Sequence, residues 1–221
     1  MQYLKQNKRK LYSIIMIHDD NFLSKALSER GTLILAAAQT LFLKHGYEGT
    51  SLEMIIADAG GSRRSIYNEF GNKRGLLLAV MQQKVAIQID TIATINYSLA
   101  PRDALKEIAI KFMQSLLSDT LISLYRLVIQ VVPDLPEVGE LIYEKGPLSG
   151  MMPLNDYLTY LNNEGILAID DCNSASFMLI AMIKDRLHFR ALLVPALTIS
   201  DDEIEAHVNR SVNLFLKAYQ P

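Results

Sequence analysis

Hydrophobic residues recur every three or four positions from about residue 28 to the end of the 221-residue chain. This spacing places apolar side chains on one face of an α-helix. The sequence has no sustained alternation of apolar and polar residues between hairpin turns, which is the mark of paired strands. Prolines and glycines lie mainly between the periodic segments, where helices begin and end. The pattern therefore predicts an all-α fold.

The first periodic segment predicts a helix that Ser28 caps and Gly46 ends. The following sequence, Thr50-Ser51-Leu52-Glu53, has the form of a capping box. In such a box Thr50 accepts a hydrogen bond from the backbone of Glu53, and the Glu53 side chain reaches back to Thr50. This box opens a short second helix, which stops at Gly60-Gly61. One continuous apolar stripe on the first helix consists of Ile34, Ala37, Ala38, Leu41 and Phe42.

Ser62 then caps a third helix over residues 63–70, and Asn72 caps a longer fourth helix that starts at Lys73. A short helix, a two-glycine turn and a second short helix with arginines at its start form a helix-turn-helix. In this motif the second helix enters the major groove of DNA, where arginine presents paired donors to guanine. Hydroxyl and lysine side chains contact phosphates and fix the docking. The pattern predicts an N-terminal three-helix DNA-binding domain.

The predicted helices carry a series of motifs at fixed offsets: Ile34-Leu35-Ala36-Ala37-Ala38, Leu41-Phe42, His45-Gly46-Tyr47, Thr50-Ser51-Leu52, Ile55-Ile56, Ala59-Gly60-Gly61-Ser62, Ile66-Tyr67, Phe70-Gly71-Asn72-Lys73 and Leu76-Leu77. Together they closely resemble the DNA-binding domain of the tetracycline-repressor (TetR) family, over about residues 28–81. Two positions depart from the family pattern. Gly61 stands where an apolar residue is usual, and Arg64 stands where a small residue is frequent.

The resemblance implies a role for eight side chains. The expected phosphate contacts are Thr50, Ser51, Tyr67 and Lys73. The expected contacts with base edges are Arg63, Arg64, Ser65 and Asn68. Two structural alternatives stay open, because Tyr67 can be a half-buried core aromatic and Lys73 a solvated surface charge. The paired arginines favour DNA more strongly, since two adjacent arginines at the start of a capped short helix gain little stability from that position.

The net charge of −2, from 22 basic and 24 acidic residues, argues against nucleic acid when it is taken alone. The charge is unevenly distributed, however. Residues 1–83 carry 11 basic and 7 acidic side chains (+4), and the remainder carries 11 and 17 (−6). Four of the first 11 lie between Lys5 and Lys10, a stretch that either follows the DNA backbone or, as we favour, is a simple tail. DNA binding then depends on a few placed donors and on dimerisation.

The apolar periodicity of the C-terminal part predicts a helical bundle. The family resemblance implies that this bundle binds a ligand and forms the dimer. Its motifs Tyr125-Arg126-Leu127-Val128-Ile129, Pro133-Asp134-Leu135-Pro136 and Gly146-Pro147 resemble the AefR-type C-terminal domain of the TetR family. One apolar stripe is formed by Leu105, Ile108, Ala109, Phe112 and Leu116, and another, after a capping box at Ser200, by Ile204, Val208, Val212, Phe215 and Tyr219. We expect an N-terminal extension (1–27), a DNA-binding domain (28–81, with the fourth helix continuing to about 97) and an effector-binding and dimerisation domain (98–221).

The segment of about residues 174–193 is apolar on almost every side between Phe177 and Ile183. It is either a fully buried core helix or part of a subunit interface. The excess of apolar residues and the resemblance favour a homodimer through about 174–193 and 201–219. Two-fold symmetry would place the paired recognition helices about 34 to 36 Å apart, which suits a palindromic operator in double-stranded DNA.

The resemblance also implies a small-molecule effector in the C-terminal bundle. Flexible thioethers and amphipathic rings suit an apolar cavity with few polar contacts, although the same residues at helical spacing are usually core packing. The candidate lining residues are Met113, Tyr125, Met152, Tyr157, Phe177, Met178, Met182 and His188. Arg126, Arg186 and Arg190 either hold an anionic ligand or, as we favour, pair with the surplus carboxylates of this region.

Other functions find little support in the sequence. Cys172 is the only cysteine and the four histidines are scattered, so we expect no intrachain disulfide, metal or cofactor. A redox role for Cys172 is disfavoured by its acidic neighbours. No apolar stretch approaches the ~20 residues of a membrane span, and the apolar run over residues 11–17 lacks a cleavage site. We therefore expect a cytoplasmic protein.

Two other classes of function are less consistent with the sequence. An enzyme is disfavoured, because no nucleophile elbow, phosphate-binding loop, metalloprotease motif or dinucleotide fingerprint is present. The alternative is a TetR-like factor that acts mainly through another protein. The retained Thr50, Ser51, Tyr67 and Lys73 count against it. The sequence thus favours a ligand-responsive DNA-binding regulator, most simply a repressor that its effector releases.

Overall fold

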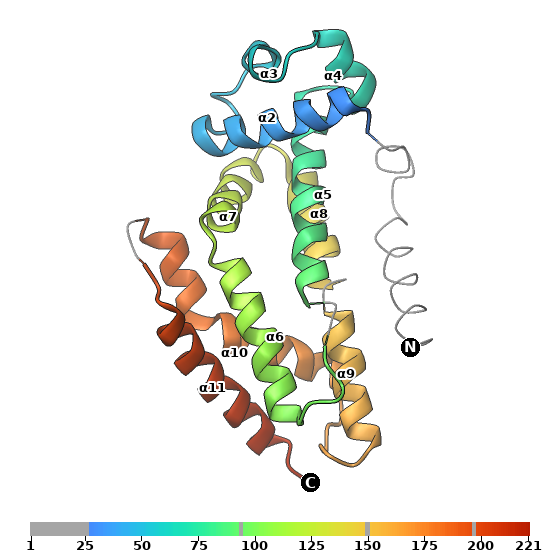
Figure 1. The fold of residues 1–221 in the computed structure, drawn as a ribbon, viewed down its shortest axis with the longest axis vertical. Coiled ribbons are helices and arrows are strands. Elements are labelled where there is room, and N and C mark those ends of the chain that lie inside the picture. Colours follow the sequence, from blue (N-terminus) through green and yellow to red (C-terminus); the bar gives the residue numbers. More distant parts are fainter. Residues whose placement is uncertain (1–26, 93–94, 149–150, 196–197) are drawn as a thin grey trace. The chain divides into compact units, whose positions relative to one another are not determined.

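The computed structural model describes residues 27–92, 95–148, 151–195 and 198–221 (Figure 1). All regular structure in these ranges is helical, which confirms the predicted all-α fold. The predicted basic tail lies outside the described residues. Numbered as in Figure 1, the helices are α2 (Glu29–His45), α3 (Leu52–Ala59), α4 (Arg63–Phe70), α5 (Lys73–Ile92), α6 (Pro101–Leu116), α7 (Asp119–Val131), α8 (Pro136–Tyr143), a π-helical turn (Glu144–Leu148), α9 (Met152–Asn163), α10 (Cys172–Leu193) and α11 (Asp201–Ala218).

The chain forms two compact units, each discontinuous in sequence. The described residues of the first, unit 1, lie within Met1–Val85 and Arg126–Ser149. Those of the second, unit 2, lie within Ala86–Tyr125 and Gly150–Pro221. The chain passes from one unit to the other within α5 and again within α7. Unit 1 thus contains α2, α3 and α4 together with α8.

The core of unit 1 is built from the apolar faces that the sequence predicts. Ile34, Ala38 and Phe42 of α2 are at most 1% exposed, and Ile66 and Phe70 of α4 are equally buried. Burial of one such large side chain stabilises the fold by about 1.5–3 kcal/mol. Ile55 of α3 and Leu76 of α5 are also fully buried. The two buried residues of α4 anchor a helix of only eight residues.

The helix caps agree with the sequence at four positions. Each capping side chain accepts a hydrogen bond from a backbone N–H three residues further on, and the four are Ser28, Ser62, Asn72 and Ser200. Gly46 and Gly60 end α2 and α3 with φ values of 73° and 71°. Glycine is required at such positions because a side chain makes positive φ unfavourable. Local sequence therefore determines where these short helices begin and end.

The predicted capping box at Thr50 is wrong by one residue. Ser51 is the N-cap of α3, and its Oγ accepts from the backbone N–H of Met54 at 3.2 Å. The Thr50 side chain is instead fully buried, with its hydroxyl 2.8 Å from the carbonyl oxygen of Gly46 and 3.1 Å from that of Leu41. The hydroxyl can donate to the Gly46 carbonyl, which lies just past the end of α2 where no further helical N–H follows.

The fourth helix is also shorter than predicted. α5 ends at Ile92, and Ile95 and Asn96 are not helical. The Asn96 side chain accepts from the backbone N–H of Ser98 at 3.0 Å and from its hydroxyl at 2.6 Å. Such a local side-chain turn competes with helical hydrogen bonding, so the helix does not continue to residue 97.

Unit 2 is a bundle with its core between α6, α9, α10 and α11. Both predicted stripes are confirmed: the five stripe residues of α6 are buried, and so are Ile204, Val208, Val212 and Phe215 of α11, while Tyr219 is half-buried. α10 is interrupted at Asp185, where φ is 23° and ψ is −138°. No helix in the described ranges has the length and apolar character needed to cross a membrane.

Candidate nucleic-acid interface and effector region

The helix-turn-helix consists of α3, the turn Gly60-Gly61 and α4. The turn is fixed by Arg30 of α2, whose Nη1 donates to the carbonyl oxygen of Ala59 at 2.8 Å. Gly61 has a φ of 102°, and a side chain at this position would meet the Arg30 side chain at 3.2 Å. The positive φ and the adjacent Arg30 side chain thus favour glycine at this position, where the family usually has an apolar residue. Sequence patterns did not reveal Arg30, because its role depends on a side chain from one helix crossing a later turn.

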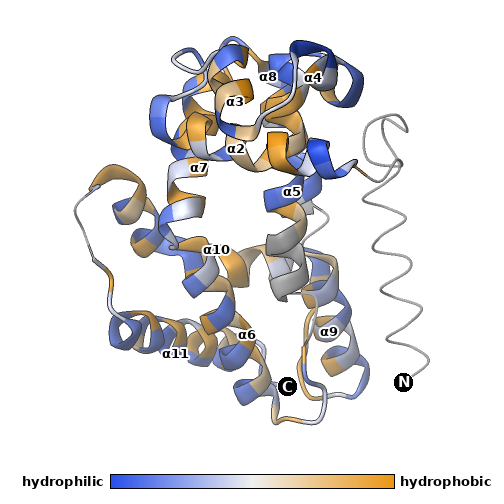
Figure 2. Cartoon of the chain, turned by 45° about the horizontal axis from the view of Figure 1, so that its top comes forward, coloured by the Kyte–Doolittle hydropathy of each residue, from blue (hydrophilic) through white to orange (hydrophobic). Residues whose placement is uncertain are grey.

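The outer side of α4 carries the predicted base-reading residues. Arg63, Arg64 and Asn68 are exposed, and Tyr67 is 53% exposed. Figure 2 shows α4 as mostly hydrophilic. The exposed Tyr67 is thus not the core aromatic of the alternative interpretation. Ser65 is half-buried beneath this surface, and its hydroxyl lies 3.2 Å from that of the helix cap Ser62.

The two arginines differ in their surroundings. Arg63 forms an ion pair with Glu53 of α3. Hydrogen bonds from the backbone of Glu53 and from Arg63 lower the pKa of the Glu53 carboxyl, which is therefore charged at neutral pH. Within the described residues, Arg64 makes no ion pair or hydrogen bond. Arg63 is thus already held by a protein partner, whereas Arg64 has none among the described residues.

The four predicted phosphate contacts also fall into different environments. Ser51 is half-buried at the N-terminus of α3. Its oxygen accepts from the backbone N–H of Met54, and its hydroxyl donates to the Glu53 carboxylate, a hydrogen bond that helps to lower the pKa of Glu53. Lys73 is half-buried and has no acidic partner among the described residues. Its Nζ lies 4.2 Å from the ring centroid of Tyr47, a cation–π contact. The Thr50 hydroxyl, buried against two carbonyl groups, does not support the predicted phosphate contact.

The predicted effector residues differ widely in burial. Met113 and Tyr157 are fully buried in the core of unit 2, whereas Met178 is 56% exposed. Burial and the neighbouring Tyr97 and Tyr160 raise the pKa of Tyr157 to about 12. Met152, Phe177 and Met182 are half-buried. A small cavity of about 20 Å³ in this unit has an apolar lining that contains none of the eight predicted residues.

Tyr125 and His188 are the two predicted effector residues that the structure brings together. Their ring centroids are 5.0 Å apart, with an angle of 75° between the ring planes. Burial raises the pKa of the Tyr125 hydroxyl. Burial and the nearby Lys184 lower the pKa of His188 to about 4, so its ring is neutral at pH 7.

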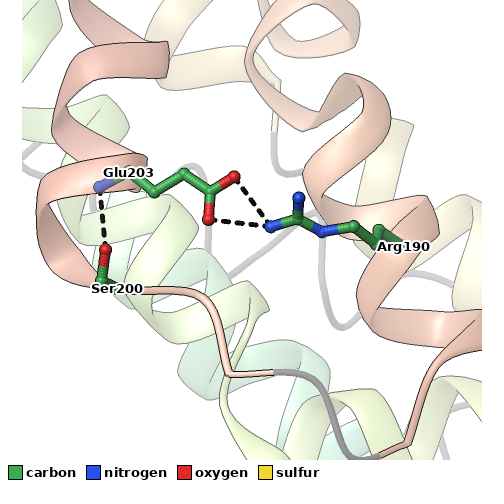
Figure 3. Close-up of polar contacts among 3 residues, drawn as sticks. All are labelled: Arg190, Ser200 and Glu203. Carbon is green, nitrogen blue, oxygen red and sulfur yellow. Dashed lines mark hydrogen bonds and ion pairs between the residues drawn. The ribbon is translucent and has the colours of Figure 1, made fainter.

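Arg190 pairs with a carboxylate, as favoured from the sequence. Its Nη2 lies 2.8 Å from each carboxylate oxygen of Glu203 (Figure 3). The backbone N–H of Glu203 donates to Ser200, so the capping residue is confirmed, while the Glu203 side chain is directed to Arg190. This pair links the end of α10 to the start of α11. Among the described residues, no three His, Cys, Asp or Glu side chains are grouped as metal ligands.

Comparisons with known proteins match both the DNA-binding region and the C-terminal region of the chain. Residues 34–80 match the family of bacterial regulatory proteins called tetR, and residues 103–221 match the C-terminal domain of AefR-like transcriptional repressors. The HTH-type transcriptional regulator RutR of Escherichia coli (strain K12) is 34% identical over 84 residues, 38% of this chain and 40% of the relative. The HTH-type transcriptional repressor AcnR of Corynebacterium diphtheriae is 33% identical over 79 residues, 36% and 42% of the two chains. This chain thus spans about two fifths of the length of these relatives.

Solved structures resemble a larger share of the chain. A protein described as a TetR-family regulator from Mesorhizobium loti MAFF303099 has a TM-score of 0.81 and 26% identity, and the match covers 89% of this chain and 100% of that one. The flavonoid-responsive regulator FrrA has a TM-score of 0.76 at 22% identity, covering 87% and 97%, a likeness that shows the fold. Members of the family are transcriptional regulators and not enzymes. The chain belongs to the TetR family of bacterial transcriptional regulators, with an AefR-like C-terminal domain.

Proposed function

We propose that the protein is a ligand-responsive repressor that acts in the cytoplasm, binds a palindromic operator as a homodimer and is released by a small, largely apolar effector. Residues 28–81 form the DNA-binding domain, and residues 98–221 bind the effector and the second subunit. The observation that carries the proposal is α4, whose two buried anchors leave Arg64, Tyr67 and Asn68 exposed on one short capped helix. The names of RutR and AcnR, a transcriptional regulator and a repressor, support this function.

The recognition helix α4 enters the major groove. Arg64 binds a guanine directly, and Arg63 binds after it leaves Glu53, an exchange made easy because exposed ion pairs are weak. Ser65 and Asn68 assist in base reading. Ser51, Tyr67 and Lys73 bind phosphates. The ring of Tyr47 holds the Lys73 ammonium in place before DNA arrives, which reduces the conformational entropy that the side chain loses on binding.

The dimer forms through α10 and α11, over about residues 174–193 and 201–219. Four large apolar side chains on these helices are more than half exposed in the single chain: Met178, Phe189, Leu193 and Leu214. Full burial of each is worth about 1.5–3 kcal/mol, so a second copy of the chain gains from covering them. Dimerisation compensates for the small positive charge of the DNA-binding region, because two recognition helices bind one operator together.

The dimer is tested by sedimentation of a variant with both Phe189→Glu and Leu214→Glu. We expect the variant to sediment as a monomer and to lose operator affinity. Ile129→Glu is the matched control, because Ile129 is 64% exposed but lies on α7 in unit 1. A dimer that persists in the double variant places the interface elsewhere.

The DNA-binding function is tested by selection of DNA from a random pool, followed by affinity measurements at several salt concentrations. A binder of this kind loses affinity steeply as salt rises, because bound phosphates release counterions. Lys73→Ala should weaken binding on all sequences and reduce the salt slope by about one. If no DNA is enriched and no salt-dependent binding is found, the repressor function is wrong and the protein-binding alternative takes its place.

A further inference from the structure

Three polar side chains gather where α7 meets α10, and all three belong to unit 2. Tyr125 comes from α7, and Lys184 and His188 lie on α10; we call them the Tyr125 cluster. The Tyr125 ring makes an edge contact with the His188 ring at 5.0 Å between centroids. The Lys184 Nζ lies 6.0 Å from the centroid of the same Tyr125 ring. The cluster thus combines a phenol, an imidazole and an ammonium group.

His188 has an unsatisfied buried atom. The residue is 8% exposed, and its Nε2 is buried with no hydrogen-bond partner among the described residues. Most buried polar side-chain atoms in native proteins have such a partner. His207, which is also buried, shows the usual arrangement, with its Nε2 3.0 Å from the carbonyl oxygen of Met182 and 3.1 Å from that of Ile183. The free Nε2 of His188 therefore marks a position where a ligand atom can complete a hydrogen bond.

Lys184 adds a positive charge to the Tyr125 cluster. It is half-buried, and this burial lowers its pKa. In the described part of the chain, Lys184 makes no ion pair, whereas Arg190 on the same helix is held by both oxygens of Glu203 (Figure 3). A half-buried ammonium without a counter-ion is unfavourable, and an anion beside it is favourable. The Tyr125 cluster therefore suits a negatively charged group.

The surroundings of the cluster suit an apolar body attached to that group. Ile180 lies one helical turn before Lys184 and, with Ile183 and Phe112, lines the cavity of about 20 Å³. This volume admits about one water molecule, so a larger ligand must displace side chains. Half-buried Met182 offers a flexible thioether for such movement. The break in α10 at Asp185, between Lys184 and His188, is the kind of backbone irregularity often found at ligand sites.

We propose that Tyr125, Lys184 and His188 bind the carboxylate of a small organic acid whose apolar part packs toward Ile180 and Ile183. The inference rests on the proposed ligand-responsive function and gives its effector a chemical class. Lys184 supplies the charge, while the Tyr125 hydroxyl and the His188 Nε2–H donate to the carboxylate oxygens. Hydrogen bonds to a charged acceptor are roughly twice as strong as neutral ones, so the carboxylate should be preferred over a neutral group of the same shape.

The test is calorimetric titration of the full chain with two matched pairs of probes, sodium octanoate against octanamide and sodium benzoate against benzamide. At least one carboxylate should bind about tenfold or more tightly than its amide. The preference should fall to about unity in Lys184→Met, which keeps the length of the side chain but removes the charge. It should decrease partly in Tyr125→Phe, which keeps the ring. Lys111→Met is the control, because Lys111 is exposed on α6 of unit 2, outside the proposed dimer interface, and it should retain the full preference.

Three results overturn the carboxylate site: neither carboxylate binds, each binds no better than its amide, or Lys184→Met retains the preference. Loss of fold is checked by thermal melting, and Lys184→Met should melt no lower than the wild type since it removes an unpaired half-buried charge. DNA binding is measured separately on the selected DNA. A chain that binds DNA but shows no carboxylate preference contradicts this inference alone, whereas one that shows the preference but binds no DNA contradicts the proposed repressor function.

Discussion

The helices α4 and α10 distribute their polar and apolar residues in opposite ways. The eight-residue α4 buries Ile66 and Phe70 and exposes Arg63 and Arg64, as an ordinary amphipathic helix does. The 22-residue α10 buries Ser176 and His188 while apolar side chains such as Phe189 remain exposed. In α4 the proposed DNA-binding surface is simply the polar face. In α10 the proposed ligand site and dimer interface lie where residues depart from the expected burial, because a ligand site needs buried polar groups and an interface needs exposed apolar ones.

The largest expected effect concerns the anchoring of α4. Phe70→Ala removes a side chain that is 1% exposed, at a cost of about 3–5 kcal/mol in folding free energy. Because Phe70 packs within unit 1, we expect faster backbone hydrogen exchange in α2, α3 and α4 and unchanged exchange in α9 and α11. Tyr67→Ala, on the exposed side of α4, is the control and should change stability by no more than about 0.5 kcal/mol. Equally faster hydrogen exchange in both units would show that the loss of Phe70 packing is not confined to unit 1.

The buried His188 of α10 should make the stability of the fold depend on pH. The pKa of His188 is about 4, below its ordinary value of 6.5. The folded chain therefore resists the protonation that the unfolded chain accepts. Stability should be constant above pH 6.5 and fall as the pH decreases toward 4, by about 3 kcal/mol in total at 1.36 kcal/mol for each pKa unit. Lys184 stays charged throughout this range, and Tyr125 stays neutral.

The measurement is urea unfolding between pH 7 and pH 4. His188→Leu should remove most of the acid sensitivity in this window, because leucine fills the site without a titrating group. His45→Gln should not, since His45 is exposed. If the wild type and His188→Leu lose stability in parallel, the titrating group lies elsewhere and His188 is not the source of the acid sensitivity.

The third prediction concerns the free arginine of α4. Arg64→Ala should weaken binding to the selected DNA by about 1–3 kcal/mol, the usual worth of a bidentate contact with guanine, and relax preference at one base. Lys73→Ala provides the contrast, because a phosphate contact carries no sequence information. Binding to a panel of single-base variants separates the two. An Arg64→Ala protein with unchanged preference at every position would show that Arg64 is not a base-reading residue.

The sequence predicted α4 well because the determinants of that region are local. A cap at Ser62, two inward apolar residues and a glycine at each end specify the helix without help from distant residues. The errors arose where local patterns had two solutions. Thr50 and Ser51 can both cap α3, and the choice depends on the carbonyl groups of Leu41 and Gly46, nine and four residues earlier, against which the Thr50 hydroxyl is buried.

Unit 2 was less predictable because its features depend on contacts between distant helices. The apolar stripes of α6 and α11 follow from helical period, and these were confirmed. Of the eight effector candidates, however, composition could not distinguish Met113 in the core from exposed Met178. Nor does any periodic pattern show that Lys184 lacks a carboxylate partner while Arg190 has one. Such differences depend on where α10 meets α7 and α11.

The smallest expected effect separates the roles of the two arginines of α4. Glu53→Gln removes the ion pair with Arg63 and one negative charge near the DNA. Asp58→Asn removes the same charge from the same helix without touching this pair, because Asp58 is exposed and makes no ion pair among the described residues. Both variants should bind DNA more tightly through reduced repulsion of phosphates.

The gain in DNA affinity from Glu53→Gln should exceed the gain from Asp58→Asn by a few-fold, because Arg63 then no longer has to break its ion pair with Glu53 before it binds DNA. The excess should vanish in an Arg63→Ala background and persist in Arg64→Ala. Equal gains from Glu53→Gln and Asp58→Asn would mean that Arg63 does not leave Glu53 when DNA binds, and Arg64 would then carry the base contact alone.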